Sequence, residues 1–115
     1  GNGAANTIID AKQASRVLNI EGTTIDVGLS GLTVTGGRTT GDNLVGETLH
    51  SGGGIRFLSG GSLTITDSTV SANSTTGIGA LGGGIYSSSG NVILQRSNVL
   101  GNSTSGYSAG CGGIL

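Results

Sequence analysis

Short runs of alternating apolar and polar side chains, separated by Gly, Ser and Asn, cover most of the chain. Leu63 and Ile65 alternate with two Thr residues, and Val92 and Leu94 repeat the same spacing. A period of two predicts β-strands, because successive side chains of a strand point to opposite faces of a sheet. The runs are only about four or five residues long and are bounded by turn-forming residues, so the pattern predicts short strands and no helices.

The same runs recur at a regular interval. The tetrapeptide Gly-Gly-Gly-Ile at 52–55 returns at 82–85, and Gly-Gly-Ile at 112–114 begins a third copy. The glycine before each isoleucine falls at positions 54, 84 and 113, so the spacings are 30 and 29 residues. Segment 62–74 also aligns without a gap with segment 91–103. A repeat of this length indicates a structure built from one supersecondary unit per copy.

A weaker copy at 16–36 is displaced from the second copy by 36 or 37 residues, because the connection from Arg38 to Ser51 is longer than its counterpart at 75–81. Short strands in a period of about 29 to 36 residues predict one coil of a solenoid, in which each strand pairs in parallel with its equivalent in the next coil. The fold class expected is all-β, a parallel β-helix (β-solenoid) with about three strands per coil. Residues 1–115 form one segment of it, either an excerpt of a longer solenoid or a stacking subunit.

Equivalent side chains of successive copies are expected to stack inside the coils. The expected apolar stacks are Ile55 on Ile85 on Ile114, Leu63 on Val92, Ile65 on Leu94, and Val70 on Val99. Sharp turns between strands need backbone angles that glycine adopts more readily than other residues. The glycines assigned to these turns are Gly54, Gly84 and Gly113.

Asn73 and Asn102 occupy the same place in two successive copies. Asn side chains stacked in this way can pass amide hydrogen bonds along the coils and satisfy backbone groups at a turn. Both residues also begin the tripeptide Asn-Ser-Thr, which fits the acceptor pattern for N-glycosylation. A buried ladder and a glycan exclude each other, so the burial of these side chains decides between the two interpretations.

The composition limits the kinds of partner. Gly supplies 25 of 115 residues, Pro, Trp and Met are missing, and only 10% of residues are charged. The formal net charge of −1 offers no basic surface for nucleic acid, and no stretch approaches the run of about 20 apolar residues that a membrane-spanning helix needs. The N-terminus does not resemble a signal peptide, and the missing Met indicates a processed product or an excised fragment. Cys111 is interpreted as a small turn residue, with an intermolecular disulfide as the alternative.

Segments 29–37, 52–55, 62–74 and 82–86 resemble the repeats of pectin-lyase-like right-handed β-helices. The resemblance is to the surface-protein type, which includes polymorphic outer membrane proteins and other bacterial cell-surface proteins and adhesins, and it covers residues 7–115. It implies a right-handed coil, an extracellular or cell-surface location, and a scaffold or adhesive role without a cofactor. The matching residues are those that build the coil, so the resemblance is specific for fold and says little about a ligand.

Enzymes of the same fold need clustered carboxylates, to hold calcium or to act as a general acid and base about 5 to 9.5 Å apart. No two carboxylates of this chain share an aligned position in neighbouring copies; the acidic residues are Asp10, Glu21, Asp26, Asp42, Glu47 and Asp67. Asp67 aligns instead with Arg96, which predicts an exposed ion pair between coils. The sequence therefore predicts no catalytic, cofactor-binding or metal site.

The long connection is the one segment that offers other chemistry. It carries Asp42, Glu47 and His50, and such a loop could line a ligand groove or hold a metal ion. One His and two carboxylates in a loop are weak evidence for either, and the role of the connection stays open.

The leading hypothesis is a non-enzymatic extracellular structural or adhesive β-solenoid that associates end to end, for example as a filament subunit, because the ends of a short coil expose unpaired strand edges. The partners expected are further copies of the chain and a glycan or cell-surface ligand, with neither nucleic acid nor membrane insertion. The alternative is a fragment of a polysaccharide-processing enzyme or a carbohydrate-binding β-helix whose active coils lie elsewhere. A third hypothesis is ice binding through Thr33-Val34-Thr35 and Thr64-Ile65-Thr66, which the alignment places on different faces.

Overall fold

The computed structural model of the 115-residue chain describes residues 3, 6–44 and 48–114. Within these residues the chain forms short β-strands and no helix, and therefore no helix that could cross a membrane. The prediction of an all-β chain is confirmed. The strands are β1 (Ile8–Asp10), β2 (Leu18–Glu21), β3 (Val27–Ser30), β4 (Thr33–Thr35), β5 (Arg38–Thr39), β6 (Ile55–Leu58), β7 (Ser62–Thr66), β8 (Thr69–Ser71), β9 (Ser74–Thr75), β10 (Ile85–Ser87), β11 (Asn91–Gln95), β12 (Asn98–Leu100) and β13 (Ser103–Thr104).

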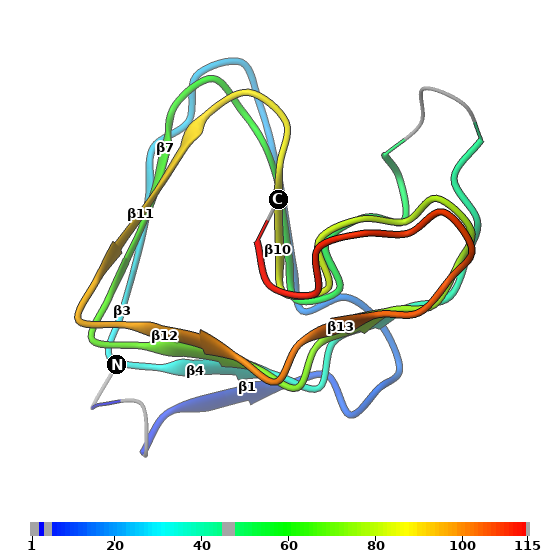
Figure 1. Ribbon diagram of the computed structural model, residues 1–115. Helices are drawn as coiled ribbons and strands as arrows, with labels where there is room; N and C mark the ends of the chain where they lie inside the picture. Colours follow the sequence, from blue (N-terminus) through cyan, green and yellow to red (C-terminus); the bar gives the residue numbers. More distant parts are fainter. Residues whose placement is uncertain (1–2, 4–5, 45–47, 115) are drawn as a thin grey trace.

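The strands assemble into sheets that each collect equivalent strands from successive repeats. The strand orders are β1-β4-β8-β12, β2-β6-β10, β3-β7-β11 and β5-β9-β13, and these pairings are parallel. We call β2 to β5 repeat 1, β6 to β9 repeat 2 and β10 to β13 repeat 3. In Figure 1 the three repeats follow almost the same path around a three-sided outline with a lobe at one corner. Parallel strands in stacked sheets are thus present, an arrangement compatible with a β-solenoid.

The described part of each repeat contains four strands, one more than the sequence predicted. The additional strand has only two residues, as in β5, too few to show a period of two. The sequence assigned Arg38 to the start of the long connection. In the structure Arg38 instead belongs to strand β5, which pairs with β9. β1 is another strand that the sequence did not predict, and it pairs with β4 through Ile9 and Val34.

Six extra residues of repeat 1 lie together at one corner. Hydrogen bonds between repeats 1 and 2 join residues 36 apart as far as Asn43, which contacts Gly79, whereas Ser51 contacts Leu81, 30 residues away. The six extra residues therefore lie between Asn43 and Ser51. The register on both sides of them is continuous, so the insertion changes the corner and leaves the sheets in place.

The aligned apolar residues lie beside one another in the sheets. The pairs are Ile55 with Ile85, Ile85 with Ile114, Leu63 with Val92, Ile65 with Leu94, and Val70 with Val99. Those of repeat 2 are fully enclosed, since Leu63, Ile65 and Val70 are at most 1% exposed. Burying a side chain of this size stabilises a fold by about 1.5 to 3 kcal/mol, so repeat 2 supplies most of the hydrophobic core.

The sequence assigned the turns to Gly54, Gly84 and Gly113, which lie at bends of the chain, but none of these three has a positive φ. The left-handed angle falls two residues earlier, at Gly52 (φ +75°), Gly82 (φ +64°) and Cys111 (φ +56°). Left-handed angles suit glycine because it lacks a Cβ atom, so Cys111 occupies a position where the two preceding repeats carry glycine.

Gly54 and Gly84 are required for a different reason, the close approach of neighbouring repeats. A Cβ atom at Gly54 would lie 2.6 Å from the carbonyl oxygen of Gly84 and 2.9 Å from the Asn73 side chain. At Gly113, where no further repeat approaches within the described chain, a Cβ atom would meet only Val99, at 3.8 Å. Stacking of backbone on backbone, and not turn geometry, excludes larger side chains at Gly54 and Gly84.

Candidate functional site

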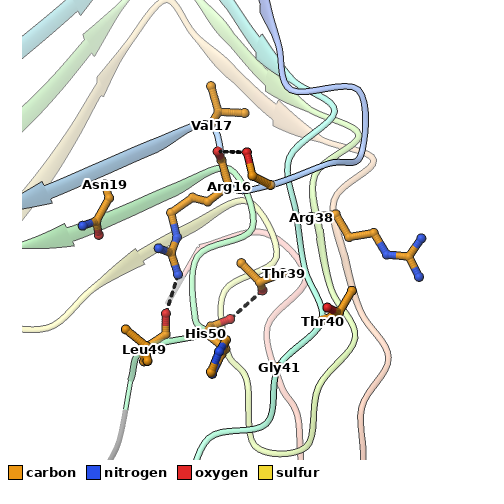
Figure 2. Close-up of a pocket in the computed structure, with 10 residues that line it drawn as sticks. Arg16, Val17, Asn19, Arg38, Thr39, Thr40, Gly41, Leu49 and His50 are labelled. Atoms are coloured by element: carbon orange, nitrogen blue, oxygen red, sulfur yellow. Dashed lines mark hydrogen bonds between the residues drawn. The ribbon is translucent and has the colours of Figure 1, made fainter.

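An open pocket of about 590 Å³ lies where repeat 1 begins. Its walls come from the start of β2, from β5 and the turn after it, and from the end of the inserted corner (Figure 2). We call it the arginine pocket; its lining residues are Ser15, Arg16, Val17, Asn19, Arg38, Thr39, Thr40, Gly41, Leu49 and His50. Two of these side chains are guanidinium groups, and none of the described lining residues is acidic.

The pocket exists because the chain makes a lobe in repeat 1 but not before it. The lobe is a stack of three turns, 40–43, 76–79 and 105–108, joined by hydrogen bonds such as Asn43 N to Ile78 O at 2.8 Å and Gly79 N to Tyr107 O at 3.0 Å. The connection from β1 to β2 is shorter and turns back before the lobe (Figure 1). The first turn of the stack is therefore left uncovered, and its exposed side forms part of the pocket.

Arg16 fixes the inserted corner from one side. Its Nε donates to the carbonyl oxygen of Gly52 at 2.9 Å, and its Nη2 donates to those of Leu49 at 2.5 Å and Ser51 at 3.1 Å. Thr39 Oγ1 donates to the carbonyl oxygen of His50 at 2.6 Å. Side chains of the sheets thus hold successive carbonyl groups of the corner, which makes its last part a fixed wall of the pocket.

Arg56 fixes the same corner from β6. Its Nε donates to the carbonyl oxygen of Thr48 at 2.9 Å, and its Nη1 donates to Glu21 Oε1 at 2.6 Å and to Asn19 Oδ1 at 3.2 Å. The Arg56 side chain is only 7% exposed, against 56% for its ion-pair partner Glu21. Burial of a guanidinium requires that its donors be satisfied, and the corner supplies the acceptor that the sheet does not.

The sequence did not reveal this arginine cluster. Arg56 follows an inward-facing Ile55 and aligns with the outward Tyr86 of repeat 3, so the strand pattern predicts an exposed side chain. It is buried because the inserted corner folds back over the outer face of β6. The available signal was Glu21, whose strand β2 lies beside β6 with Asn19 directly opposite Arg56.

The charges of the cluster are unevenly compensated. Burial lowers the pKa of the Arg16 guanidinium below its ordinary value, and repulsion from Arg56 lowers it further, whereas Glu21 opposes the shift. Glu21 is already paired with Arg56. Among the described residues neither Arg16 nor Arg38 forms an ion pair, and Arg38 is exposed at the edge of the pocket. Within the described part of the chain, the charges of Arg16 and Arg38 are therefore not balanced by an ion pair.

His50 closes the pocket beside the first lobe turn. Its ring lies against Gly41, where a Cβ atom would clash with the imidazole, and its Nδ1 is buried without a hydrogen-bond partner. Asp42 does not join it, because Asp42 Oδ1 accepts from the backbone N of Ile78 at 2.7 Å. Glu47 lies outside the described residues. No cluster of three metal-binding side chains occurs in the part of the chain that the structure describes.

The two aligned Asn residues form a hydrogen-bonded ladder. Asn73 Nδ2 donates to Asn102 Oδ1 at 3.0 Å, and Asn73 Oδ1 accepts from the backbone N of Gly37 at 2.8 Å. Asn102 Nδ2 continues the pattern to the carbonyl oxygen of Val70 at 2.9 Å. Asn73 is 1% exposed, so the folded chain presents no acceptor for a glycan at this position.

Asp67 and Arg96 form a two-contact ion pair on the outside of the sheets. Arg96 Nε donates to Asp67 Oδ1 at 2.7 Å and Arg96 Nη2 to Oδ2 at 3.2 Å. The hydrogen bond from Arg96 lowers the pKa of Asp67, and the same bond raises the pKa of Arg96. Both side chains are more than half exposed, so the pair lies outside any pocket and has the character of a surface contact.

Asp10 and Asp26, like Asp42, accept hydrogen bonds from backbone N–H groups. Asp10 Oδ1 accepts from the backbone N of Lys12 at 2.8 Å, and Asp26 Oδ1 accepts from that of Ser62 at 2.8 Å. Comparison of the chain with models of protein families, with curated protein sequences and with solved structures finds no match.

Proposed function

We propose that the chain is a segment of a right-handed β-solenoid of the pectin-lyase-like surface-protein type, with a non-enzymatic structural or adhesive role outside the cell. We further propose that it associates end to end with copies of itself. Parallel sheets that run through all three repeats support a stiff rod, because each repeat is hydrogen-bonded to the next along one axis.

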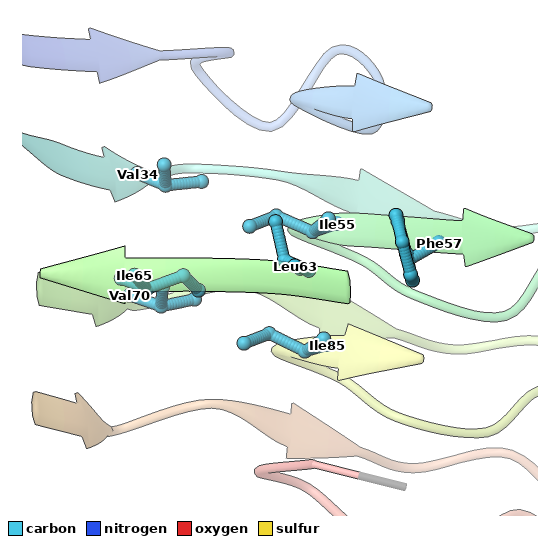
Figure 3. Close-up of a cluster of buried hydrophobic side chains, with 7 residues drawn as sticks. All are labelled: Val34, Ile55, Phe57, Leu63, Ile65, Val70 and Ile85. Carbon is cyan, nitrogen blue, oxygen red and sulfur yellow. The ribbon is translucent and has the colours of Figure 1, made fainter. Parts of the chain in front are cut away.

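The observation that supports the proposal is an apolar edge of repeat 3 that no described residue covers. The core side chains in Figure 3 lie between the strands of repeats 1 and 2 and the start of repeat 3. The side chains that continue these apolar rows at the edge are exposed to solvent. Leu94 is 39% exposed, whereas its neighbour Ile65 is 1% exposed, and Ile114 is 36% exposed, whereas Ile85 is fully buried. An apolar row beside an unpaired strand edge favours the addition of another strand layer.

The occupant that fits this edge is a strand layer of the same kind. The inward side chains of repeat 3 continue the apolar rows of repeats 1 and 2. Parallel strand pairing sets the spacing of these rows at about 4.8 Å between layers. A second copy offers such rows at β2 and β3, where Leu18, Ile20, Val27 and Leu29 are only partly buried. End-to-end contact would cover both sets of side chains.

Electron microscopy and size-exclusion chromatography over a range of protein concentrations test the proposal. We expect rods that lengthen with concentration and a layer line near ~4.8 Å along their axis. Leu94→Lys should abolish assembly, because it places a charge on the inward row. Ile93→Lys is the matched control, since Ile93 is 41% exposed, adjacent in β11, and opposite Thr64 on the outer face.

Circular dichroism of both variants checks that the strands are retained. A protein that stays monomeric at every concentration would contradict end-to-end association. Equal loss of assembly in both variants would show that rods form through the outer face of β11 and not through its edge.

A further inference from the structure

The basic residues of the chain are concentrated around the arginine pocket. Arg16, Arg38 and Arg56 are three of the five Lys and Arg residues, although the formal net charge is −1. Of these three arginines, only Arg56 has a carboxylate partner among the described residues. The pocket therefore carries uncompensated positive charge in a partly buried setting, where charges interact more strongly than in open water.

Arg16 is held in place by hydrogen bonds that use only some of its N–H donors. A guanidinium group has five N–H donors, and the three described hydrogen bonds of Arg16 come from Nε and Nη2. Its Nη1 donates to none of the described residues. A cation fixed by neutral carbonyl oxygens keeps its charge, and it needs no ordering when a ligand arrives.

Two further groups are placed to complete such a site. His50 lines the pocket, and its buried Nδ1 has no hydrogen-bond partner among the described residues. The Arg38 side chain extends from β5 into solvent at the opposite wall (Figure 2). Side-chain rotamers commonly change when a ligand binds, so the exposed Arg38 is the mobile guanidinium beside the pocket.

We propose that the arginine pocket binds a small anion, a phosphate or carboxylate group carried on a polar molecule. Arg16 is the fixed guanidinium of the site and Arg38 the mobile one, with His50 at the wall formed by the inserted corner. The hydroxyl groups of Ser15 and Thr40 line the same space and suit the polar remainder of the ligand. This site is independent of the end-to-end association proposed above.

Nuclear magnetic resonance titration at low ionic strength tests the site with inorganic phosphate, with acetate, and with chloride at matched ionic strength. We expect saturable shifts of the Gly41 and His50 amide signals with phosphate or acetate and none with chloride. Saturation by phosphate alone identifies a phosphate site, and saturation by acetate alone a carboxylate site. Arg38→Gln should weaken binding about tenfold or more, because it removes one charge-assisted hydrogen bond.

Arg96→Gln is the matched control, because it removes the same charge from an exposed arginine outside the pocket. It should change the affinity by less than about twofold, because Arg96 does not line the pocket and its charge is already paired with Asp67. Equal loss in both variants, or shifts that never saturate, would overturn the proposal in favour of diffuse attraction. Repeating the titration with Leu94→Lys keeps assembly from masking the pocket, so the two proposals can fail separately.

Discussion

Replacing Asn73 by Ala should destabilise the chain far more than the same change at Asn102. Asn73 is 1% exposed and makes three described side-chain hydrogen bonds: to Gly37 N at 2.8 Å, to Val34 O at 3.2 Å and to Asn102 Oδ1 at 3.0 Å. The variant leaves the Gly37 N–H and the Val34 carbonyl without these partners in a site that water does not reach. A buried polar group left unpaired costs about 1 to 3 kcal/mol, so the loss for these two groups should be about 2 to 6 kcal/mol.

Asn102 provides the comparison because it holds the same turn one repeat later and is only partly buried. Its Nδ2 donates to Val70 O at 2.9 Å, and its Oδ1 accepts from the backbone N and from Nδ2 of Asn73, both at 3.0 Å. Water can replace part of these contacts at the exposed edge. We expect a loss of about 1 kcal/mol, the ordinary net value of an intramolecular hydrogen bond.

Urea unfolding of the wild type and both variants, followed by circular dichroism, measures the two free energies of unfolding. A loss below about 0.5 kcal/mol for Asn73→Ala, the range of ordinary surface substitutions, would refute the ladder as a stabilising element. A larger loss at Asn102 than at Asn73 would show that burial does not set the cost.

Two further predictions concern the arginines. Arg56→Met should loosen the inserted corner and lower the free energy of unfolding by about 1 to 3 kcal/mol, because the Thr48 carbonyl and Glu21 lose a buried donor. We expect the amides of residues 48–52 to exchange faster than in Tyr86→Met, the control at the equivalent position of repeat 3. Unchanged exchange would contradict this prediction. Arg96→Gln should raise the pKa of Asp67 toward its ordinary value, as measured by carboxyl NMR titration, because the hydrogen bond from Arg96 lowers that pKa. A lowered folded pKa means that the pair stabilises the fold above the unfolded pKa of Asp67 and that this contribution disappears as the pH falls through the folded pKa; a difference between wild type and variant that persists at lower pH would argue against this origin.

The spacing of the repeats predicted which residues lie side by side, because a constant interval in a parallel arrangement brings Leu63 to Val92 and Ile65 to Leu94. Features shorter than the pattern were missed, such as β5, whose two residues carry no periodicity. The run Gly-Gly-Gly could not show which glycine takes the left-handed angle, since composition is the same at all three positions. The arginine pocket was missed because Arg56 and Arg16 meet through a corner whose path the sequence does not specify.

The inserted corner of repeat 1 has a practical consequence for engineering. Six extra residues are accommodated between Asn43 and Ser51 while hydrogen bonds to repeat 2 continue on both sides at separations of 36 and 30 residues. Lengthening a flexible loop costs little, about 0.6 kcal/mol for each doubling of its length. The equivalent corner of repeat 2, between Gly79 and Leu81, should accept a foreign peptide of similar length, which would turn the stacked turns into a display site for epitopes at regular intervals along the axis.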